Sequence, residues 1–140
     1  MADLAPDRAA SSRANLAAET DVAPRVLVGD ADVYTGFDGF RKLLDRKDVE
    51  VVIIAGPPGF RPMHVEAAIN AGKHVFMEKP VAVDPVGVRR VIAAGAKADE
   101  RKLCIVSGTQ RHERSYLEAA PCRWAPSARS SRALLLGIRE

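Results

Sequence analysis

Residues 72–80 read Gly72-Lys73-His74-Val75-Phe76-Met77-Glu78-Lys79-Pro80 and set the architecture expected for this chain. The apolar run from His74 to Met77 predicts a short strand, and the glycine before it predicts the end of a helix. The strand delivers an acid, a lysine and a proline to its carboxyl end. Ligands bind at the carboxyl ends of strands in parallel α/β sheets. We therefore expect Glu78, Lys79 and Pro80 to lie at a ligand-binding edge.

Apolar runs on either side of this stretch predict more strands of the same kind. Val51–Ala55 is a continuous, largely β-branched run, which we expect to be a central parallel strand buried on both faces. Leu103–Ser107 predicts a further strand. A helix is expected over residues 62–71, and Asp84 and Pro85 are the expected N-cap and first residue of another. Strands that alternate with helices imply parallel pairing through right-handed crossovers.

The first third of the chain carries weaker signals. A helix is expected from Pro6 to about Glu19, with a buried stripe made of Ala10, Ala14, Leu16 and Ala17. Residues 20–32 have the composition of a loop, and Val33-Tyr34 predicts a short strand. A second helix is expected to begin at Gly36-Phe37, because apolar residues recur there at helical spacing: Phe37, Phe40, Leu43 and Leu44. Residues 112–119 predict the polar start of a last helix.

The composition is that of one small globular domain, with 140 residues of which 47% are apolar and 28% charged. The net charge of +3 arises in residues 120–140, so we expect no nucleic-acid partner for the fold. Cys104 and Cys122 form neither a disulfide framework nor a metal set, and Cys104 is expected to be a small buried hydrophobe. With no apolar run long enough for a membrane span and no signal peptide, a cytoplasmic protein without a membrane partner is expected.

The ordered series of helix, Ala-Gly-Lys-His-Val, strand, Glu-Lys-Pro and capped helix resembles the glucose-fructose oxidoreductase/inositol dehydrogenase family (Gfo/Idh/MocA). The resemblance covers about residues 2–119. It implies an NAD(P)-binding domain of an oxidoreductase that acts on secondary alcohols of sugars or polyols. It also implies that Lys79 lies near the nicotinamide ribose and the substrate hydroxyl and moves a proton. The alternative for Lys79 is an ordinary surface lysine in a strand-to-helix loop.

The same resemblance implies cofactor contacts by residues that follow the strands: Asp3, Gly56, Pro57, Pro58, His64, Glu78, Lys79, Pro80 and Gln110. Asp3 would accept hydrogen bonds from the adenosine ribose, which favours NAD over NADP because an acid repels a 2′-phosphate. Each has a structural alternative. Gly56–Pro58 could be a turn before a helix, His64 a packed helix residue, Asp3 a frayed terminus and Gln110 part of a polar helix start.

The sequence departs from the family pattern in two places. It contains no Gly-x-Gly-x-x-Gly turn, which holds the pyrophosphate at a helix N-terminus, and nothing that corresponds to a substrate domain. We therefore expect an incomplete Rossmann-like, doubly wound parallel sheet over residues 1–119 that lacks its first strand and glycine-rich turn. Residues 120–140 are expected to be an irregular tail, and a frameshift near Ala119–Arg123 would explain it, because the shifted reading resembles the family's continuation.

Two functions follow, and a third remains open. The chain is expected to be an impaired fragment of an NAD- or NADP-dependent oxidoreductase, so whether it is itself an enzyme stays open. Alternatively, it is a non-catalytic interaction module that pairs an exposed sheet edge with a partner chain or with another copy of itself. A gene remnant without function is the third reading. We expect weak or no NAD(P) binding, marginal stability and a tendency to associate.

Overall fold

The computed structural model describes residues 1–109. Gln110, the predicted helix start at residues 112–119 and the predicted tail at 120–140 lie outside that part. Helices and strands alternate along the described chain in this order: β1 Ala2–Asp3, α1 Pro6–Ala18, β2 Tyr34–Thr35, α2 Gly39–Leu44, β3 Val51–Ile54, α3 Arg61–Asn70, β4 His74–Glu78, α4 Pro85–Glu100 and β5 Ile105–Gly108. Short 3-10 turns at Ala23–Arg25 and Asp30–Asp32 interrupt the loop between α1 and β2.

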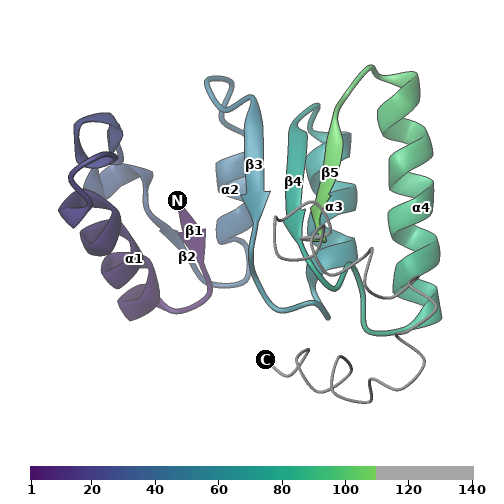
Figure 1. Cartoon of the computed structure of the whole chain (residues 1–140), viewed down its shortest axis with the longest axis horizontal. Helices are drawn as coiled ribbons and strands as arrows, with labels where there is room; N and C mark the ends of the chain where they lie inside the picture. The colour runs from purple at the N-terminus through teal and green to yellow at the C-terminus, as the bar shows by residue number, and fades with distance from the viewer. Residues whose placement is uncertain (110–140) are drawn as a thin grey trace, which may run out of the picture. The chain divides into compact units, whose positions relative to one another are not determined.

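The strands form two sheets. The pairing within each sheet is parallel, as the alternation of strands and helices predicts. One sheet has three strands in the order β3-β4-β5, and the other pairs β1 with β2 (Figure 1). The register places Val51 opposite His74 and Glu78 opposite Gly108. The two strands of every pair are parallel, so the carboxyl ends of β3, β4 and β5 lie at the same edge of their sheet. This edge carries the residues singled out by the sequence.

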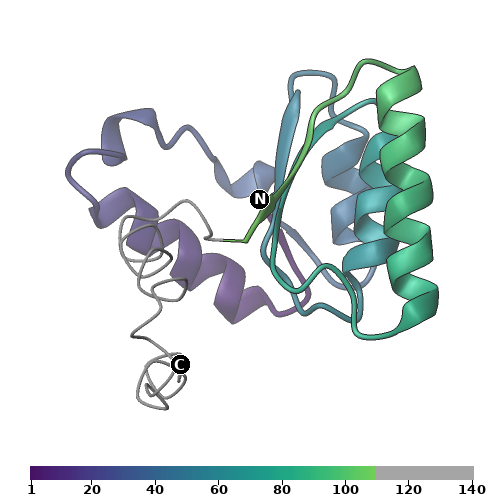
Figure 2. The ribbon, with the colours of Figure 1, turned by 45° about the vertical axis from the view of Figure 1, so that its right-hand side comes forward.

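Helices α3 and α4 cover one face of the three-stranded sheet (Figure 2). Val52 and Ile54 of β3 are buried against them, whereas Val51 and Ile53 are 59% and 75% exposed. The prediction that β3 is a central strand buried on both faces is therefore wrong. In the described residues β3 lies at the edge of its sheet, and no helix covers its second face.

The hydrophobic core lies between this sheet and its helices. It is formed by buried side chains of α2, α3, α4, β3 and β4: Leu44, Val52, Ile54, Val65, Ala68, Ile69, Val75, Met77, Val91, Ala94 and Ala98. Small residues on α3 and α4 let the two helices pack closely against each other. Val86, Val88 and Ile92 of α4 are exposed.

Local signals at the helix ends are confirmed. The Asp84 carboxylate accepts a hydrogen bond from the Gly87 backbone N–H at 2.6 Å, and Pro85 is the first residue of α4. Gly72 follows α3 with a positive φ of 76°, a conformation that favours glycine at a helix C-terminus. These signals were readable because each depends only on neighbouring residues.

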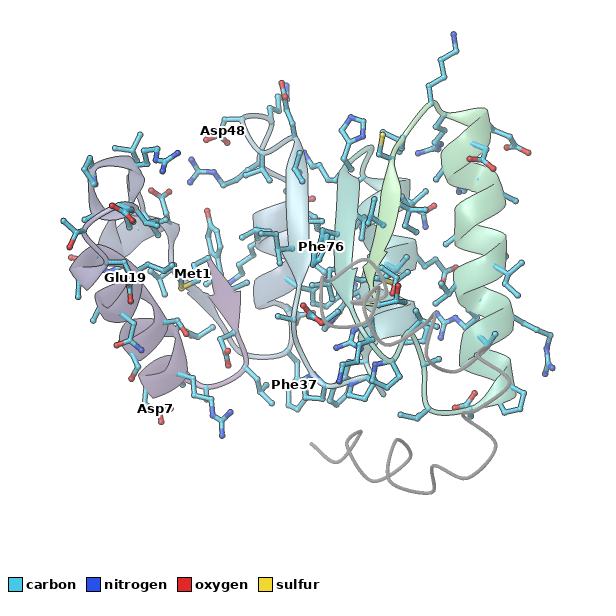
Figure 3. All side chains as sticks on the ribbon, viewed as in Figure 1. Met1, Asp7, Glu19, Phe37, Asp48 and Phe76 are labelled. Atoms are coloured by element: carbon cyan, nitrogen blue, oxygen red, sulfur yellow. The ribbon has the colours of Figure 1, made fainter. Side chains whose placement is uncertain are left out.

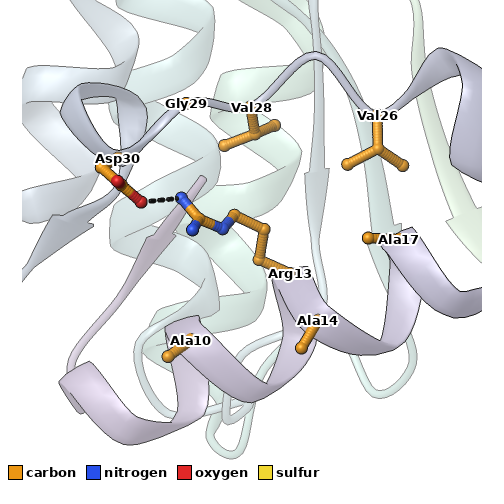
Figure 4. A pocket seen from close by; sticks show the side chains of 8 residues that line it. All are labelled: Ala10, Arg13, Ala14, Ala17, Val26, Val28, Gly29 and Asp30. Atoms are coloured by element: carbon orange, nitrogen blue, oxygen red, sulfur yellow. Dashed lines mark ion pairs between the residues drawn. The ribbon is translucent and has the colours of Figure 1, made fainter.

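Helix α1 follows its predicted bounds but not its predicted burial. Only Ala9 of this helix is buried, and Leu16 is 40% exposed. Ala10, Ala14 and Ala17 face Val26 and Val28 across an open cavity of about 450 Å³ (Figure 4). The three alanines are exposed, so the predicted stripe is not packed by residues 1–109.

Helix α2 is shorter than the spacing suggests. It begins at Gly39, so Phe37 lies in the preceding loop and is exposed, at the strand-end edge of the molecule (Figure 3). Gly39 itself fits closely, because a Cβ there would lie 3.1 Å from the backbone of Tyr34. The close approach of the helix start to β2 explains why a glycine occupies this position.

One further expectation for a single side chain is wrong. Cys104, which directly precedes β5, is exposed rather than buried. Lys73 is buried, and its ammonium donates a hydrogen bond to the Arg46 backbone carbonyl at 2.6 Å. The Cys104 backbone N–H donates to His74 Nδ1 at 2.9 Å, which orients that imidazole at the amino end of β4.

Candidate functional site

The candidate site is the edge at which β3, β4 and β5 end. Gly56, Pro57 and Pro58 follow β3, while Glu78 ends β4 and is followed by Lys79 and Pro80, which are joined by a cis peptide bond. Gly108 ends β5 and pairs with Glu78. The structure thus brings most of the predicted site residues to one edge, which is where parallel sheets bind ligands.

Glu78 and Gly108 fit closely across the two strands. A Cβ on Gly108 would lie 3.2 Å from both carboxylate oxygens of Glu78 and 3.1 Å from the Phe76 ring. The Lys79 backbone N–H donates a hydrogen bond to the Glu78 carboxylate at 3.3 Å. The glycine therefore makes room for the carboxylate, and the carboxylate helps to fix the backbone at which Lys79 begins.

The Lys79 side chain is exposed at this edge. Its ammonium forms neither an ion pair nor a hydrogen bond with another of residues 1–109. An ammonium with three free donors can bind an oxygen of a ligand or exchange a proton with it. Its surroundings therefore leave Lys79 available for chemistry rather than committed to the fold.

The loop after β3 is open to solvent. Gly56 is exposed, and a Cβ placed on it would meet no atom within 4 Å. Packing within the protein therefore does not require glycine here. A bare backbone with open space beside it lets a ligand approach closely, which is the use the sequence suggests for this loop.

Arg61, the first residue of α3, connects the two loops and was not anticipated from the sequence. One of its terminal nitrogens donates to the Gly56 carbonyl at 2.5 Å, and the other donates to the Pro80 carbonyl. The side chain is buried, with 2% of its surface exposed. The available signal was an arginine at a helix start, where a positive charge is unfavourable to the helix dipole.

His64 lies one turn further along α3 and packs between aromatic rings. Its ring centroid is 4.5 Å from that of Phe40 and 6.3 Å from that of Phe60. Burial lowers the pKa of the imidazole, because the charged form loses hydration. These contacts support the packing alternative raised for His64, while its predicted cofactor contact remains a prediction.

Asp3 ends β1, as predicted, but belongs to the two-stranded sheet rather than to the β3-β4-β5 sheet. One of its carboxylate oxygens accepts a hydrogen bond from the Ala5 backbone N–H at 3.0 Å, which shapes the turn into α1. The carboxylate is only partly buried. Its position at a strand end suits a ribose-binding acid.

The residues present fit one half of a dinucleotide better than the other. The open backbone at Gly56 suits a ribose or a nicotinamide ring, and so does the ammonium of Lys79, which has no partner within the described residues. The pyrophosphate has no corresponding cradle, since the sequence has no Gly-x-Gly-x-x-Gly turn. Within residues 1–109, no group of three potential metal ligands occurs. These features are those of a parallel α/β domain with a candidate ligand-binding edge where β3, β4 and β5 end.

Comparison with known proteins identifies the family. The profile described as "Oxidoreductase family, NAD-binding Rossmann fold", GFO_IDH_MocA, matches residues 6–114. This chain belongs to that family. Inositol 2-dehydrogenase from Salmonella typhimurium is 37% identical over 82 residues, which make up 59% of this chain and 24% of that protein.

Solved structures agree with this assignment. Scyllo-inositol dehydrogenase from Lactobacillus casei, crystallised with NAD(H) and scyllo-inositol, matches 84% of this chain and 30% of its own at 28% identity and a TM-score of 0.54. KijD10, a 3-ketoreductase from Actinomadura kijaniata crystallised with TDP-benzene and NADP, matches 86% of this chain and 32% of its own at 26% identity and a TM-score of 0.61.

The shared region is one part of a larger protein in these relatives. The chain spans about a quarter of the curated inositol dehydrogenase, where coverage is 24%, and about a third of the solved structures, where it is 30% and 32%. The match confirms the Rossmann-type parallel α/β fold and an NAD-binding family. Among the described residues, no helix is both long and apolar enough to cross a bilayer.

Proposed function

We propose that this chain supplies the nicotinamide-side part of the NAD-binding domain of an oxidoreductase that acts on a secondary alcohol of a sugar or polyol. The observation that carries the proposal is the exposed Lys79 at the strand-end edge, whose ammonium has no ion-pair or hydrogen-bond partner among residues 1–109. It shares that edge with the open Gly56 loop and the Glu78–Gly108 pair. The substrates named for the inositol dehydrogenases and the ketoreductase above support a polyol or sugar as the substrate class.

In this proposal each residue has a limited task. A bound nicotinamide would accept a hydride from the carbinol carbon. As the carbonyl forms, Lys79 Nζ accepts the hydroxyl proton as a neutral amine and becomes the ammonium. Glu78 fixes the backbone from which Lys79 extends, and Gly56 leaves the cofactor edge open. Asp3, at the end of β1, binds the adenosine ribose and favours NAD.

Binding by the chain alone is expected to be weak, because the pyrophosphate cradle is absent from this sequence. The test is a titration of the 15N-labelled chain with NADH, followed by NMR. We expect amide shifts to change at Gly56, Lys79 and Gly108, with a dissociation constant of about 1 mM, which corresponds to about 4 kcal/mol.

A matched pair of variants makes this test specific. Lys79→Met should weaken the NADH-dependent shifts, whereas Lys47→Met, which removes an equally exposed lysine before β3, should leave them unchanged. Micromolar affinity by calorimetry would contradict the expected weakness. Shift changes that avoid the strand-end loops, or no change at all, would contradict the proposed function itself.

A second candidate is favoured by the uncovered face and free edge of β3. Val51, Ile53 and Val106 are 59%, 75% and 53% exposed, and among the strands of residues 1–109 β3 pairs with β4 only. An unpaired parallel edge beside exposed apolar residues is a template for strand addition. In this candidate the chain is a non-catalytic module, and a second copy covers this edge.

Sedimentation velocity separates this candidate from a monomer. We expect the chain to self-associate, and Ile53→Lys to suppress association by placing a charge on the open face. Ile92→Lys is the matched control, because Ile92 is 66% exposed on α4, away from that edge. A wild-type chain that stays monomeric at high concentration, or an equal effect of the two lysines, would remove the candidate.

A further inference from the structure

Arg61 is a buried cation that touches two loops of the candidate site at once. Its guanidinium donates to the carbonyl of Gly56, after β3, at 2.5 Å and to the carbonyl of Pro80, after β4. Only 2% of the residue is exposed. No other side chain among residues 1–109 makes hydrogen bonds to both loops.

The position of Arg61 conflicts with two local rules. A cation in the first turn of a helix opposes the helix dipole, and α3 begins at this residue. A buried charge is normally paired with an opposite charge, yet none of the ion pairs formed by the described residues includes Arg61. Its Nε is also buried and has no hydrogen-bond partner within the part of the chain that the structure describes. Residues that violate local rules in this way concentrate at functional sites.

We propose that Arg61 is a positioning residue, which fixes the loop at Gly56 against the loop at Pro80 and thereby sets the place of Lys79. Pro80 follows Lys79 directly, so a hydrogen bond to the Pro80 carbonyl restrains the backbone from which Lys79 extends. This inference rests on the proposed function in one respect only, which is the kind of ligand that the site binds. The coupling of the two loops rests on the hydrogen bonds alone.

The chemistry of the side chain explains why arginine would be needed. A guanidinium is planar and presents donors in a fixed fork, so it can serve two carbonyls in a defined mutual position. A lysine at the same place keeps the charge but offers a single mobile ammonium. Arg61→Lys therefore removes the fork and retains the charge, which separates positioning from electrostatics.

The experiment compares the full chain with two arginine-to-lysine variants, Arg61→Lys and Arg90→Lys. Arg90 is the control, because it forms an exposed ion pair with Glu66 at 2.5 Å, on α4 and α3. Hydrogen exchange of the 15N-labelled proteins is measured at the non-proline amides of the two loops and, for comparison, in the core of α3. The loop amides are those of Gly56, Gly59, Lys79, Val81 and Ala82. We expect Arg61→Lys to speed exchange in both loops about tenfold and to weaken NADH binding about tenfold, with the core of α3 unchanged.

The outcomes distinguish positioning from a general structural role. Equal exchange in the two variants would overturn the inference, and so would a change in which the loops and the core of α3 accelerate together. If Arg61→Lys does not fold, the wild type decides: its Arg61 guanidinium protons should be protected from exchange, and freely exchanging protons would overturn the inference. A wild type without NADH-dependent shifts contradicts the proposed function, while loop exchange still decides the role of Arg61.

Discussion

The segment from α2 to β5 and the segment from β1 to β2 follow the same α/β pattern but bury apolar surface very differently. All members of the main core cluster lie between Leu44 and Ala98. The N-terminal segment contributes a single buried apolar residue, Ala9, and its two strands have two residues each. An apolar stripe therefore stabilises a helix only where another surface packs against it.

The largest expected difference between the two segments is the free energy of unfolding that is lost when one large apolar side chain is truncated to alanine. Ile69 of α3 is fully buried, whereas Leu16 of α1 is 40% exposed. Ile69→Ala should lower the free energy of unfolding by about 2–5 kcal/mol, because it leaves a cavity between the sheet and its helices. Leu16→Ala should cost less than about 1 kcal/mol. Urea unfolding followed by circular dichroism measures both, and equal losses would contradict the contrast.

A smaller effect is expected from substitutions of two glycines of α4, because their surroundings differ within the better-packed segment. A Cβ on Gly87 would lie 2.9 Å from the Ala82 Cβ and 3.0 Å from the Pro62 ring, whereas one on Gly95 would meet no atom within 4 Å. Gly87→Ala should therefore destabilise the protein by about 1–3 kcal/mol through overpacking.

Gly95→Ala provides the matched control for that substitution. It should stabilise the protein by up to about 1 kcal/mol, because alanine restricts the unfolded chain and favours the helix. The same urea measurements apply to both variants. Two substitutions of the same sign would show that the contact at Gly87 does not limit the packing of α4.

The sequence predicted best what depends on near neighbours. The Asp84 cap and the Gly72 helix end follow from residues close together in the chain. The parallel pairing of β3, β4 and β5 follows from the alternation of strands and helices along the chain. Burial was predicted less well. The open face of Ile53 and the exposure of Cys104 depend on whether a distant element covers them, and composition cannot report that.

The candidate site also contains residues that the sequence could predict and one that it could not. The motif Glu78-Lys79-Pro80 could be assigned to a strand end from its sequence, and the structure places it there. Arg61 could not be found in this way, because its role depends on two carbonyls that lie 5 and 19 residues away along the chain. Backbone carbonyls have no signature in the sequence, so a residue that acts through them becomes visible only in the fold.

The smallest expected effect concerns His64, where the aromatic packing of α3 meets the candidate site. Burial against Phe40 and Phe60 lowers the folded-state pKa of the imidazole below its ordinary value of 6.5. Above pH 6.5 both the folded and unfolded states hold neutral His64, and its contribution to stability is complete. As the pH falls below 6.5, the unfolded state binds a proton first, so the free energy of unfolding should fall until the pH passes the folded pKa. The loss should be below about 1 kcal/mol, because the ring is only half-buried.

His64→Gln tests this titration directly. The variant has no imidazole at this position, so the difference in unfolding free energy between wild type and variant should shrink as the pH is lowered from 7.5 to 5.5. Urea unfolding at several pH values measures the slope, and the remaining titrating groups cancel in the comparison because both proteins share them. A difference that stays constant over this range would mean that water reaches the imidazole despite its two aromatic neighbours. The site would then be open on the α2 side of α3 as well as at the strand ends.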